Sequence, residues 1–236
     1  MAPAWTFKPG SPGSVVAFLG VCALVIASLL TAVGKSARRD GKPPGRRVLG
    51  VALGTAAWLG ALGLLVRSGW VEAMPAPRLL ILMGGILFVS VAAGLSPLGR
   101  WLAVGPTIAW LVAFQGFRLP LELVLHAWAH AGVIPRSMTW DGSNWDIASG
   151  IVALVLAPLA SRFRAAAWAA NAIGIVLLAN VILDAARSSP GPLWSGVQPP
   201  LLLPFHLPYA LILPVCVGGA LVGHLALTRA LLAKRR

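Results

Sequence analysis

The chain has 236 residues, of which 58% are hydrophobic and only 11% are charged, and its formal net charge is +13. An ordinary soluble domain has about 25% charged residues, so this composition excludes a soluble globular protein and indicates an integral membrane protein. The positive charge does not indicate nucleic-acid binding, because the basic residues stand beside the ends of apolar runs and form no basic amphipathic surface. Cys22 and Cys216 lie inside apolar runs without metal-ligand spacing, so neither a disulfide framework nor a zinc knuckle is indicated.

The chain begins with a short polar lead at residues 1–13, followed by an apolar run at residues 14–34. This run is long enough to cross a bilayer as a helix. A cleavable signal peptide carries its positive charge before the apolar core, but here six basic residues follow the run, between positions 35 and 47. We therefore expect a first transmembrane helix with its N-terminus outside and its C-terminal end in the cytoplasm.

Further apolar runs predict six more spans. They lie at residues 48–66, 78–95, 101–131, 146–160, 165–183 and 201–227. Pro120 is expected to kink the fourth span, because proline removes a backbone hydrogen bond and clashes with the preceding turn. The fold class predicted for residues 14–236 is thus an all-α, polytopic transmembrane helix bundle of about seven spans in one domain. The spacing of Gly50 and Gly54 also predicts a close approach of the second span to a neighbouring helix.

The distribution of basic residues gives the orientation of this bundle. The connections that are cytoplasmic in a seven-span arrangement hold 13 of the 19 lysines and arginines, and of the six acidic residues only Asp40. Positive charge accumulates on the cytoplasmic side, so the N-terminus is expected outside and the C-terminus inside. The expected location is the cell inner membrane, with the lipid bilayer as the partner, no nucleic acid and an undetermined oligomeric state.

One stripe of polar residues interrupts the fourth span. Gln115 and Arg118 are followed by Glu122, His126 and His130 at steps of four, which places these side chains on one slowly turning face of a helix. Ionisable groups at membrane depth are costly and are usually functional. If the span starts at residue 101, Arg118 lies about 26 Å along it, near the outer edge of the hydrocarbon layer. Arg118 and Glu122 are natural ion-pair partners, and a purely structural pair is the alternative to a functional one.

The histidines raise a second hypothesis. His126 and His130 have the i,i+4 spacing that lets two imidazoles bind one metal ion, and His206 is expected near the same face of the membrane. These three residues are therefore candidate ligands of a divalent metal or a haem. The sequence HAWAH lacks the glutamate of the zinc-protease pattern HExxH, and no motif in the chain requires a cofactor. Histidines without a metal at the membrane interface are the alternative.

The polar segment between the fourth and fifth spans completes the candidate pocket. Residues 135–146 include Asn144 and Asp146, which can either cap the fifth helix or face the pocket of Arg118 and Glu122. In the first case the segment is an ordered turn without further function. In the second, acidic, basic and amide groups meet in one outer layer. The pocket candidates are Gln115, Arg118, Glu122, His126, Asn144, Asp146 and His206.

The same residues carry a resemblance. The pattern Arg118-x-Pro-x-Glu122 followed by Pro135-x-x-Met-Thr-Trp-x-Gly-x-Asn-Trp-Asp146 resembles a signature of an uncharacterised family of bacterial multi-pass membrane proteins. The similarity extends over most of residues 70–230, with Trp140 and Trp145 in place of the expected Phe or Tyr. The resemblance implies a bacterial membrane protein and, because that family has no assigned activity, no catalytic residue.

Three function classes remain open at this stage. The first is binding or transport of a small solute or of protons through an outward-facing polar pocket. The second is a membrane enzyme or redox protein with a metal or haem on the outer histidines, and the third is an accessory or assembly protein. The chain contains no GxxxxGK[ST] nucleotide motif and no GxSxG serine-hydrolase motif. An enzyme is therefore the less favoured class, and catalytic residues are unknown.

Overall fold

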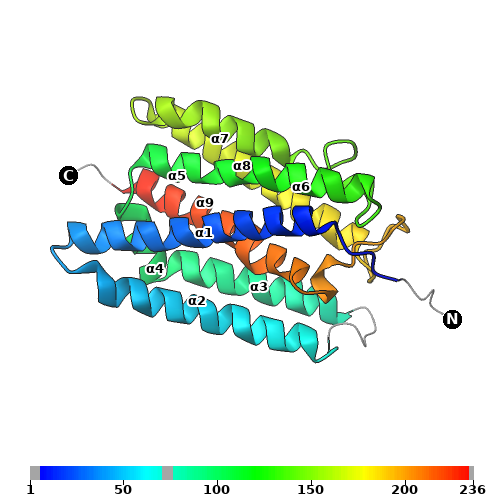
Figure 1. Cartoon of the computed structure of the whole chain (residues 1–236). Helices are drawn as coiled ribbons and strands as arrows, with labels where there is room; N and C mark the ends of the chain where they lie inside the picture. The colour runs from blue at the N-terminus through cyan, green and yellow to red at the C-terminus, as the bar shows by residue number, and fades with distance from the viewer. Residues whose placement is uncertain (1–5, 71–76, 234–236) are drawn as a thin grey trace.

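The computed structural model describes residues 6–70 and 77–233, which form a bundle of roughly parallel and antiparallel helices (Figure 1). Parts of the N-terminal lead, of the connection between the second and third expected spans and of the basic C-terminus lie outside the described residues. The α-helices are α1 (Pro12–Arg39), α2 (Pro44–Arg67), α3 (Pro77–Leu95), α4 (Pro97–Val104), α5 (Ile108–Phe114), α6 (Arg118–His130), α7 (Asp146–Ala160), α8 (Arg164–Ser188) and α9 (Gly218–Leu232). Shorter helical turns are η1 (Gln115–Phe117), η2 (Arg136–Met138), η3 (Leu203–Phe205), η4 (Tyr209–Leu211) and the π-helical η5 (Ile212–Val217).

The structure supports a membrane protein, with the all-α class that the sequence predicts. Within the described residues, five helical segments are long and apolar enough to cross a membrane: Pro12–Arg39, Pro44–Arg67, Ile108–His130, Arg164–Ser188 and Tyr209–Leu232. A sixth is possible if α3 and α4, which meet at a bend of 60°, are one broken span. α7 is apolar but has only 15 residues. The expected count of seven spans therefore remains a prediction.

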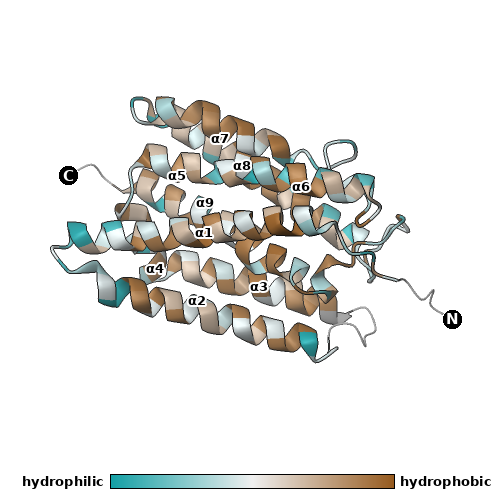
Figure 2. Ribbon diagram, in the orientation of Figure 1, coloured by the Kyte–Doolittle hydropathy of each residue, from teal (hydrophilic) through white to brown (hydrophobic). Residues whose placement is uncertain are grey.

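The helices are mostly apolar along their middle parts, and hydrophilic residues gather at their ends and in the connections (Figure 2). Val16, Leu53, Phe88 and Val176 expose 61–73% of their surface on different helices. Large exposed apolar faces of this kind are rare on soluble proteins and suit contact with lipid chains. α2 is the most exposed of these helices, with only 6% of its most apolar window buried.

Basic side chains at one end of the bundle bind backbone carbonyls where helices end. Arg229 Nη1 donates to the carbonyl oxygens of Gly94 at 2.7 Å and Ser96 at 2.9 Å, at the junction of α3 and α4. Arg39 Nη1 donates to the carbonyl of Val104, the last residue of α4, at 2.6 Å. Carbonyls in the last turn of a helix have no intrahelical donor, and a cation there also complements the helix dipole. These arginines thus have structural partners within the chain.

The fourth expected span begins later than the sequence indicated, and this changes the position of Arg118 along it. The chain breaks at Gly105 and Pro106, and Thr107 caps a new helix by accepting a hydrogen bond from Trp110 N at 3.2 Å. Counted from Ile108, Arg118 lies about 15 Å along the Ile108–His130 segment instead of about 26 Å along the expected span, which is close to the middle of that segment. The residues from Pro97 to Val104 belong to α4, which is bent away from α3. The last long segment also starts later, at Tyr209 instead of residue 201.

The irregularity expected at Pro120 takes the form of one 3-10 turn, η1, between α5 and α6. Pro120 has no N–H to donate to the carbonyl four residues earlier, at Gly116, and the helix tightens there. The adjoining glycine positions bring α7 close. A Cβ atom at Gly150 would lie 2.6 Å from the backbone nitrogen of Leu119, and one at Gly116 would lie 2.6 Å from Leu154 Cδ2. At Gly150 only glycine allows this approach to the backbone of Leu119, which places the start of α7 beside Arg118.

The close approach predicted at Gly50 and Gly54 is wrong for this chain. A Cβ atom at either position would meet nothing within 4 Å among the described residues. The two glycines lie on exposed parts of α2, and the small-residue spacing there does not bring another helix of the same chain into contact. The tight contacts in the bundle are made by other glycines, where a backbone of a neighbouring element or a large side chain covers the missing Cβ.

Candidate functional site

Arg118 is the centre of the most polar part of the interior. Its side chain is 1% exposed, and Nη1 donates hydrogen bonds to Ser149 Oγ at 2.6 Å, Asp146 Oδ1 at 2.8 Å and the Gly174 carbonyl at 3.1 Å. The three acceptors come from α7 and α8, so one guanidinium joins α6 to two other helices. A buried cation in this setting needs both a counter-ion and hydrogen-bond acceptors, and the structure supplies both.

Glu122, one turn further along α6, is bound through the segment that precedes α7. Asn144 Nδ2 donates to Glu122 Oε1 at 3.1 Å and to the Met138 carbonyl at 3.0 Å, and Asn144 Oδ1 accepts from Asp146 N at 3.0 Å. Asn144 therefore caps the first N–H of α7 and holds Glu122 at the same time. The sequence left open whether this segment caps the fifth helix or faces the pocket of Arg118 and Glu122, and Asn144 does both. We call Arg118, Glu122, Asn144 and Asp146 the buried polar cluster, since each is at most 4% exposed.

The ion pair differs from the one that the sequence suggested. Arg118 pairs with Asp146 from the adjacent helix, and among the described residues no ion pair joins Arg118 to Glu122. Helical spacing places Glu122 near Arg118, but the close packing at Gly150 brings Asp146 nearer still. The carboxylate of Glu122 instead accepts from the neutral amide of Asn144.

A second polar group lies next to the cluster, on the side of Gly174. His224, 1% exposed on α9, contacts Asn171 Oδ1 through Nδ1 at 2.9 Å, and Asn171 Nδ2 donates to Thr228 Oγ1 at 2.7 Å. Because the Asn171 oxygen can only accept, Nδ1 carries the proton and Nε2 of a neutral ring is an acceptor. A Cβ atom on Gly174 would lie 2.8 Å from His224 Nε2 and 3.3 Å from Ser149 Oγ. The glycine therefore leaves both polar atoms facing one small space.

Several polar atoms of this interior have no hydrogen-bond partner in the described part of the chain. They are Gln115 Oε1, Arg118 Nη2, Glu122 Oε2 and His224 Nε2. The amide nitrogen of Gln115 is satisfied, since it donates to the Ala220 carbonyl at 3.2 Å. Buried polar atoms are paired in most proteins, and groups left unpaired are found mainly where a ligand, a water molecule or a proton binds. The concentration of such atoms around Arg118 therefore marks this region as the candidate site.

A cavity of about 50 Å³ adjoins the buried polar cluster. Arg118, Glu122 and Asp146 form its polar wall, and apolar side chains, among them Met83 of α3 and Leu178 of α8, form the rest. One water molecule needs about 10–15 Å³ of such volume, so the space holds about four waters. Pockets for drug-sized ligands measure about 300 Å³ or more. In this conformation the cavity admits water, protons or a very small solute.

A larger cavity of about 310 Å³ lies on the other side of η5, between α1, α2, α3, α5 and α9. Its lining is almost entirely apolar and includes none of the four residues of the buried polar cluster. Pro214 and Val215 of η5 face this cavity, whereas Leu213 and Cys216 face the smaller one. Pro214 removes one backbone donor, which accounts for the irregular hydrogen bonding of η5. A π-helical turn, an element frequent at functional sites, thus forms part of the wall between the two cavities.

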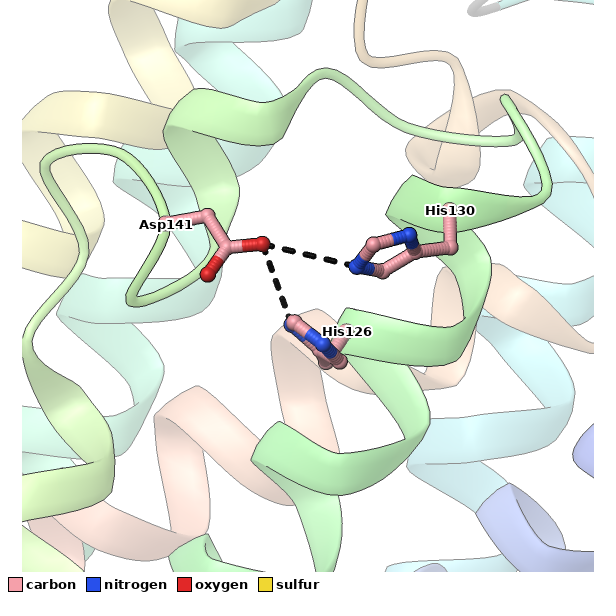
Figure 3. A group of neighbouring side chains, drawn as sticks. All are labelled: His126, His130 and Asp141. Atoms are coloured by element: carbon pink, nitrogen blue, oxygen red, sulfur yellow. Dashed lines mark ion pairs between the residues drawn. The ribbon is translucent and has the colours of Figure 1, made fainter.

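The three histidines proposed as metal ligands divide into two places. His126 and His130 of α6 lie beside Asp141 of the segment between α6 and α7, with Asp141 Oδ2 at 3.7 Å from His126 Nδ1 and 3.4 Å from His130 Nε2 (Figure 3). These three residues, the rim cluster, are the group of described side chains whose ligand atoms lie within 4.8 Å of one another. His206 instead stacks on Phe7, with ring centroids 4.0 Å apart. The structure therefore pairs the two helical histidines with an aspartate, where the sequence suggested His206.

Sequence reasoning identified the main cluster but missed the residues that extend it. Ser149 and Asn171 are small polar residues within apolar helices and carry no spacing signal. His224 was not among the candidate residues, but the close contact at Gly174 brings it beside Ser149. Asp141 had a visible signal, since Asp141-Gly142 is a strong turn dipeptide, and such a turn directs its side chain back over the end of α6.

Comparison with known proteins adds no assignment, because no protein-family model matches the chain and neither curated proteins nor solved structures show significant similarity to it. The function is therefore inferred from the geometry of the site.

Proposed function

We propose that this protein is a multi-pass carrier of the bacterial inner membrane in which the buried polar cluster binds a proton and couples it to transport. The observation that carries this proposal is the ratio of charges in the cluster. Two carboxyl groups, Glu122 and Asp146, share one guanidinium, that of Arg118, and Asp146 is the one in direct contact. If both carboxyl groups are ionised, the cluster has one negative charge without a counter-ion in a region of low dielectric constant.

A proton on Glu122 removes this imbalance. The site for it exists, because Glu122 Oε2 is buried and has no hydrogen-bond partner in the described chain, while Oε1 is held by Asn144. A protonated carboxyl also gains a donor, which the adjoining cavity can satisfy with water. The charged groups of the cluster that bear on Glu122 are Arg118 of the same helix and Asp146 of α7. Carboxyl groups in such surroundings are the usual proton carriers of membrane pumps and transporters.

The residues around Gly174 offer a route for that proton towards the other side of the bundle. Ser149 is bound to Arg118, and its Oγ faces the same small space as His224 Nε2. His224 in turn connects through Asn171 to Thr228, whose hydroxyl donates to the His224 carbonyl at 2.8 Å. Chains of carboxylates, hydroxyls and imidazoles are the side-chain types that relay protons within membranes.

The volume of the cavity favours a proton over a large solute as the species bound at this cluster. About 50 Å³ is far below the size of a pocket for a metabolite-sized ligand. A carrier that moves a small solute through an outward-facing state would have to widen this space, whereas proton binding needs no change in volume. Proton coupling is thus the part of the proposal that the present geometry supports directly.

The arrangement of the chain agrees with an odd number of crossings, N-terminus out and C-terminus in. The start of α1 and the end of α9 lie at opposite ends of the bundle (Figure 1). The end that contains the α1–α2 connection and the end of α9 is also the one predicted to hold 13 of the 19 basic residues. Positive charge on the cytoplasmic side supports the proposed orientation, with the rim cluster towards the outside.

The test is proton movement in liposomes that contain the purified protein and an enclosed pH-sensitive dye. The parent protein should dissipate an imposed pH gradient faster than empty liposomes, and Glu122→Gln should reduce the rate to that of empty liposomes. Asp184→Asn is the matched control, because Asp184 is also a buried carboxylate but lies outside the cluster, where it accepts from Asn180 at 3.3 Å. Equal rates for the parent and for Glu122→Gln would refute the proposal.

A further inference from the structure

The rim cluster combines two histidines of α6 and one aspartate of the following segment around a common point (Figure 3). His126 and His130 are one helical turn apart, so their rings project from the same face, and their centroids are 4.4 Å apart. Asp141 reaches this face from the opposite side, and its Oδ2 lies 3.7 Å from His126 Nδ1 and 3.4 Å from His130 Nε2. The arrangement offers two nitrogen ligands and one oxygen ligand from two separate chain segments.

The distances fit a bound metal ion better than direct hydrogen bonds. Hydrogen bonds between nitrogen and oxygen measure about 2.7–3.2 Å, and the two contacts of Asp141 Oδ2, at 3.4 Å and 3.7 Å, are longer. Ligand atoms placed about 2.0–2.1 Å from a tetrahedral zinc ion lie about 3.4 Å from one another. An ion at the centre would thus contact all three side chains with only small adjustments of their positions.

The orientation of His126 is fixed without any use of its Nδ1 atom. This nitrogen is shielded from solvent and has no hydrogen-bond partner within the described residues. The ring stacks on Trp140 with centroids 4.0 Å apart and an angle of 11° between the planes. A nitrogen that is held in place, shielded and directed towards a carboxylate and a second imidazole is a preformed ligand position.

The segment that carries Asp141 is also ordered before any ion binds. The Thr139 carbonyl accepts from Gly142 N at 2.9 Å, and Asn180 of α8 donates to the Ser143 carbonyl at 2.7 Å. A Cβ atom at Gly142 would lie 2.6 Å from the Arg136 carbonyl oxygen, so the turn is tightly folded against itself. Binding would therefore cost little ordering of the chain.

The geometry points to a site for a divalent transition-metal ion of the zinc class, bound by His126 Nδ1, His130 Nε2 and Asp141 Oδ2 with a fourth position open to water. This set is of the type in which zinc keeps three protein ligands and one exchangeable position. A haem is not compatible with these two histidines, because rings of one helix face at 4.4 Å leave no room for a macrocycle between them. The site goes beyond the proposed function and does not depend on it.

The metal site lies directly beside the buried polar cluster. Glu122 and His126 are consecutive positions on one face of α6, and Asp141 and Asn144 belong to the same turn. An ion that joins Asp141 to α6 would fasten that turn at the surface, while the Asn144–Glu122 hydrogen bond fastens it inside. Metal binding therefore stabilises the segment that supplies Asn144 and Asp146 to the cluster.

The test is a zinc titration of the full-length protein in detergent by calorimetry, supported by the visible absorption of bound Co²⁺. The parent should bind one ion. His130→Ala and Asp141→Ala should each weaken binding about tenfold or more, since even loss of an outer-shell partner commonly costs about 10–100-fold. Both residues are exposed, so these variants should fold, and their metal-free thermal unfolding checks this.

His206→Ala is the histidine control, because His206 stacks on Phe7 away from the rim cluster and should leave zinc affinity unchanged. Glu122→Gln should also bind zinc like the parent, which separates this site from the proposed proton site. Absence of zinc and Co²⁺ binding in the parent, or unchanged affinity in both His130→Ala and Asp141→Ala, would overturn the inference.

Discussion

Arg118 and Asp146 form an ion pair with 2.8 Å between Nη1 and Oδ1, although 28 residues separate them in the chain. The pair joins α6 to α7 near the middle of the proposed membrane span, where each charge alone would be costly. The ion pair holds α6, α7 and the segment between them together. These elements contain the buried polar cluster and the rim cluster, and they form part of the wall of the small cavity.

Removal of the charge of Arg118 should lower the stability of the protein more than removal of the charge of Asp146. Arg118→Gln leaves Glu122 and Asp146 buried without a cation, and we expect a loss of about 3–5 kcal/mol of stability. Asp146→Asn leaves Arg118 with Glu122 as a counter-ion and should cost less. The loss in Arg118→Gln should also be smaller at acid pH, where protons neutralise the carboxylates. Thermal unfolding in detergent at several pH values measures both differences, and equal losses at all pH values would argue against the shared charge balance.

The double variant separates a structural pair from a functional one. Removing both charges of a buried pair is often close to neutral, so Arg118→Gln/Asp146→Asn should recover much of the stability that Arg118→Gln loses. If the pair takes part in function, the double variant should show no proton flux even though it is stable, because the two charges are still missing. A double variant with parental flux would assign the pair to the scaffold alone.

The sequence correctly predicted which residues form the buried polar cluster, but not which of them form the ion pair. Arg118, Glu122, Asn144 and Asp146 were recognisable because ionisable and amide groups stand out among apolar residues. Their pairing was not recognisable. Helical spacing favours an ion pair between Arg118 and Glu122, whereas the observed pair of Arg118 with Asp146 depends on the close contact of Gly150 with Leu119. The start of the fourth span was predicted too early for a related reason: the chain breaks at Gly105 and Pro106, and only the structure shows that the next long segment begins at Ile108. The contact of His206 with Phe7 and that of His224 with Asn171 join segments far apart in the sequence, which periodicity does not encode.

Two glycines make a matched test of the close approach between α6 and α7. Gly150→Ala would place a Cβ atom 2.6 Å from the backbone nitrogen of Leu119, so α7 must shift and carry Asp146 away from Arg118. We expect a loss of about 1–3 kcal/mol, as for other overpacked positions. Gly50→Ala meets nothing within 4 Å and should be neutral or slightly stabilising, since alanine favours helices by about 1 kcal/mol. Similar unfolding temperatures for the two variants would contradict this packing.

Orientation can be tested by cysteine labelling, because the two native cysteines, Cys22 and Cys216, are buried at 4% and 2% exposure and should give little background. Lys42 and Ser195 are exposed in connections at opposite ends of the bundle. In intact cells a membrane-impermeant maleimide should modify Ser195→Cys, and Lys42→Cys should react only after the membrane is opened. Labelling of Lys42→Cys in intact cells would reverse or refute the proposed topology.

The contact between Asn171 and His224 should affect both stability and proton movement if the proposed relay is correct. Asn171→Ala leaves His224 Nδ1 without its acceptor, and an unsatisfied buried donor costs about 1–3 kcal/mol. The same change frees the ring to turn, so Nε2 no longer faces Ser149 across Gly174, and proton flux in liposomes should fall.

Asn180→Ala is the control for this experiment, because Asn180 lies on the same helix, α8, but donates to the Ser143 carbonyl and to Asp184 instead. It should preserve flux even if it lowers stability. A relay predicts that flux falls in Asn171→Ala at temperatures well below unfolding, where a purely structural role would leave it at the parental rate. Parental flux in both variants would remove His224 from the route and restrict the proposed proton site to Arg118, Glu122 and Asp146.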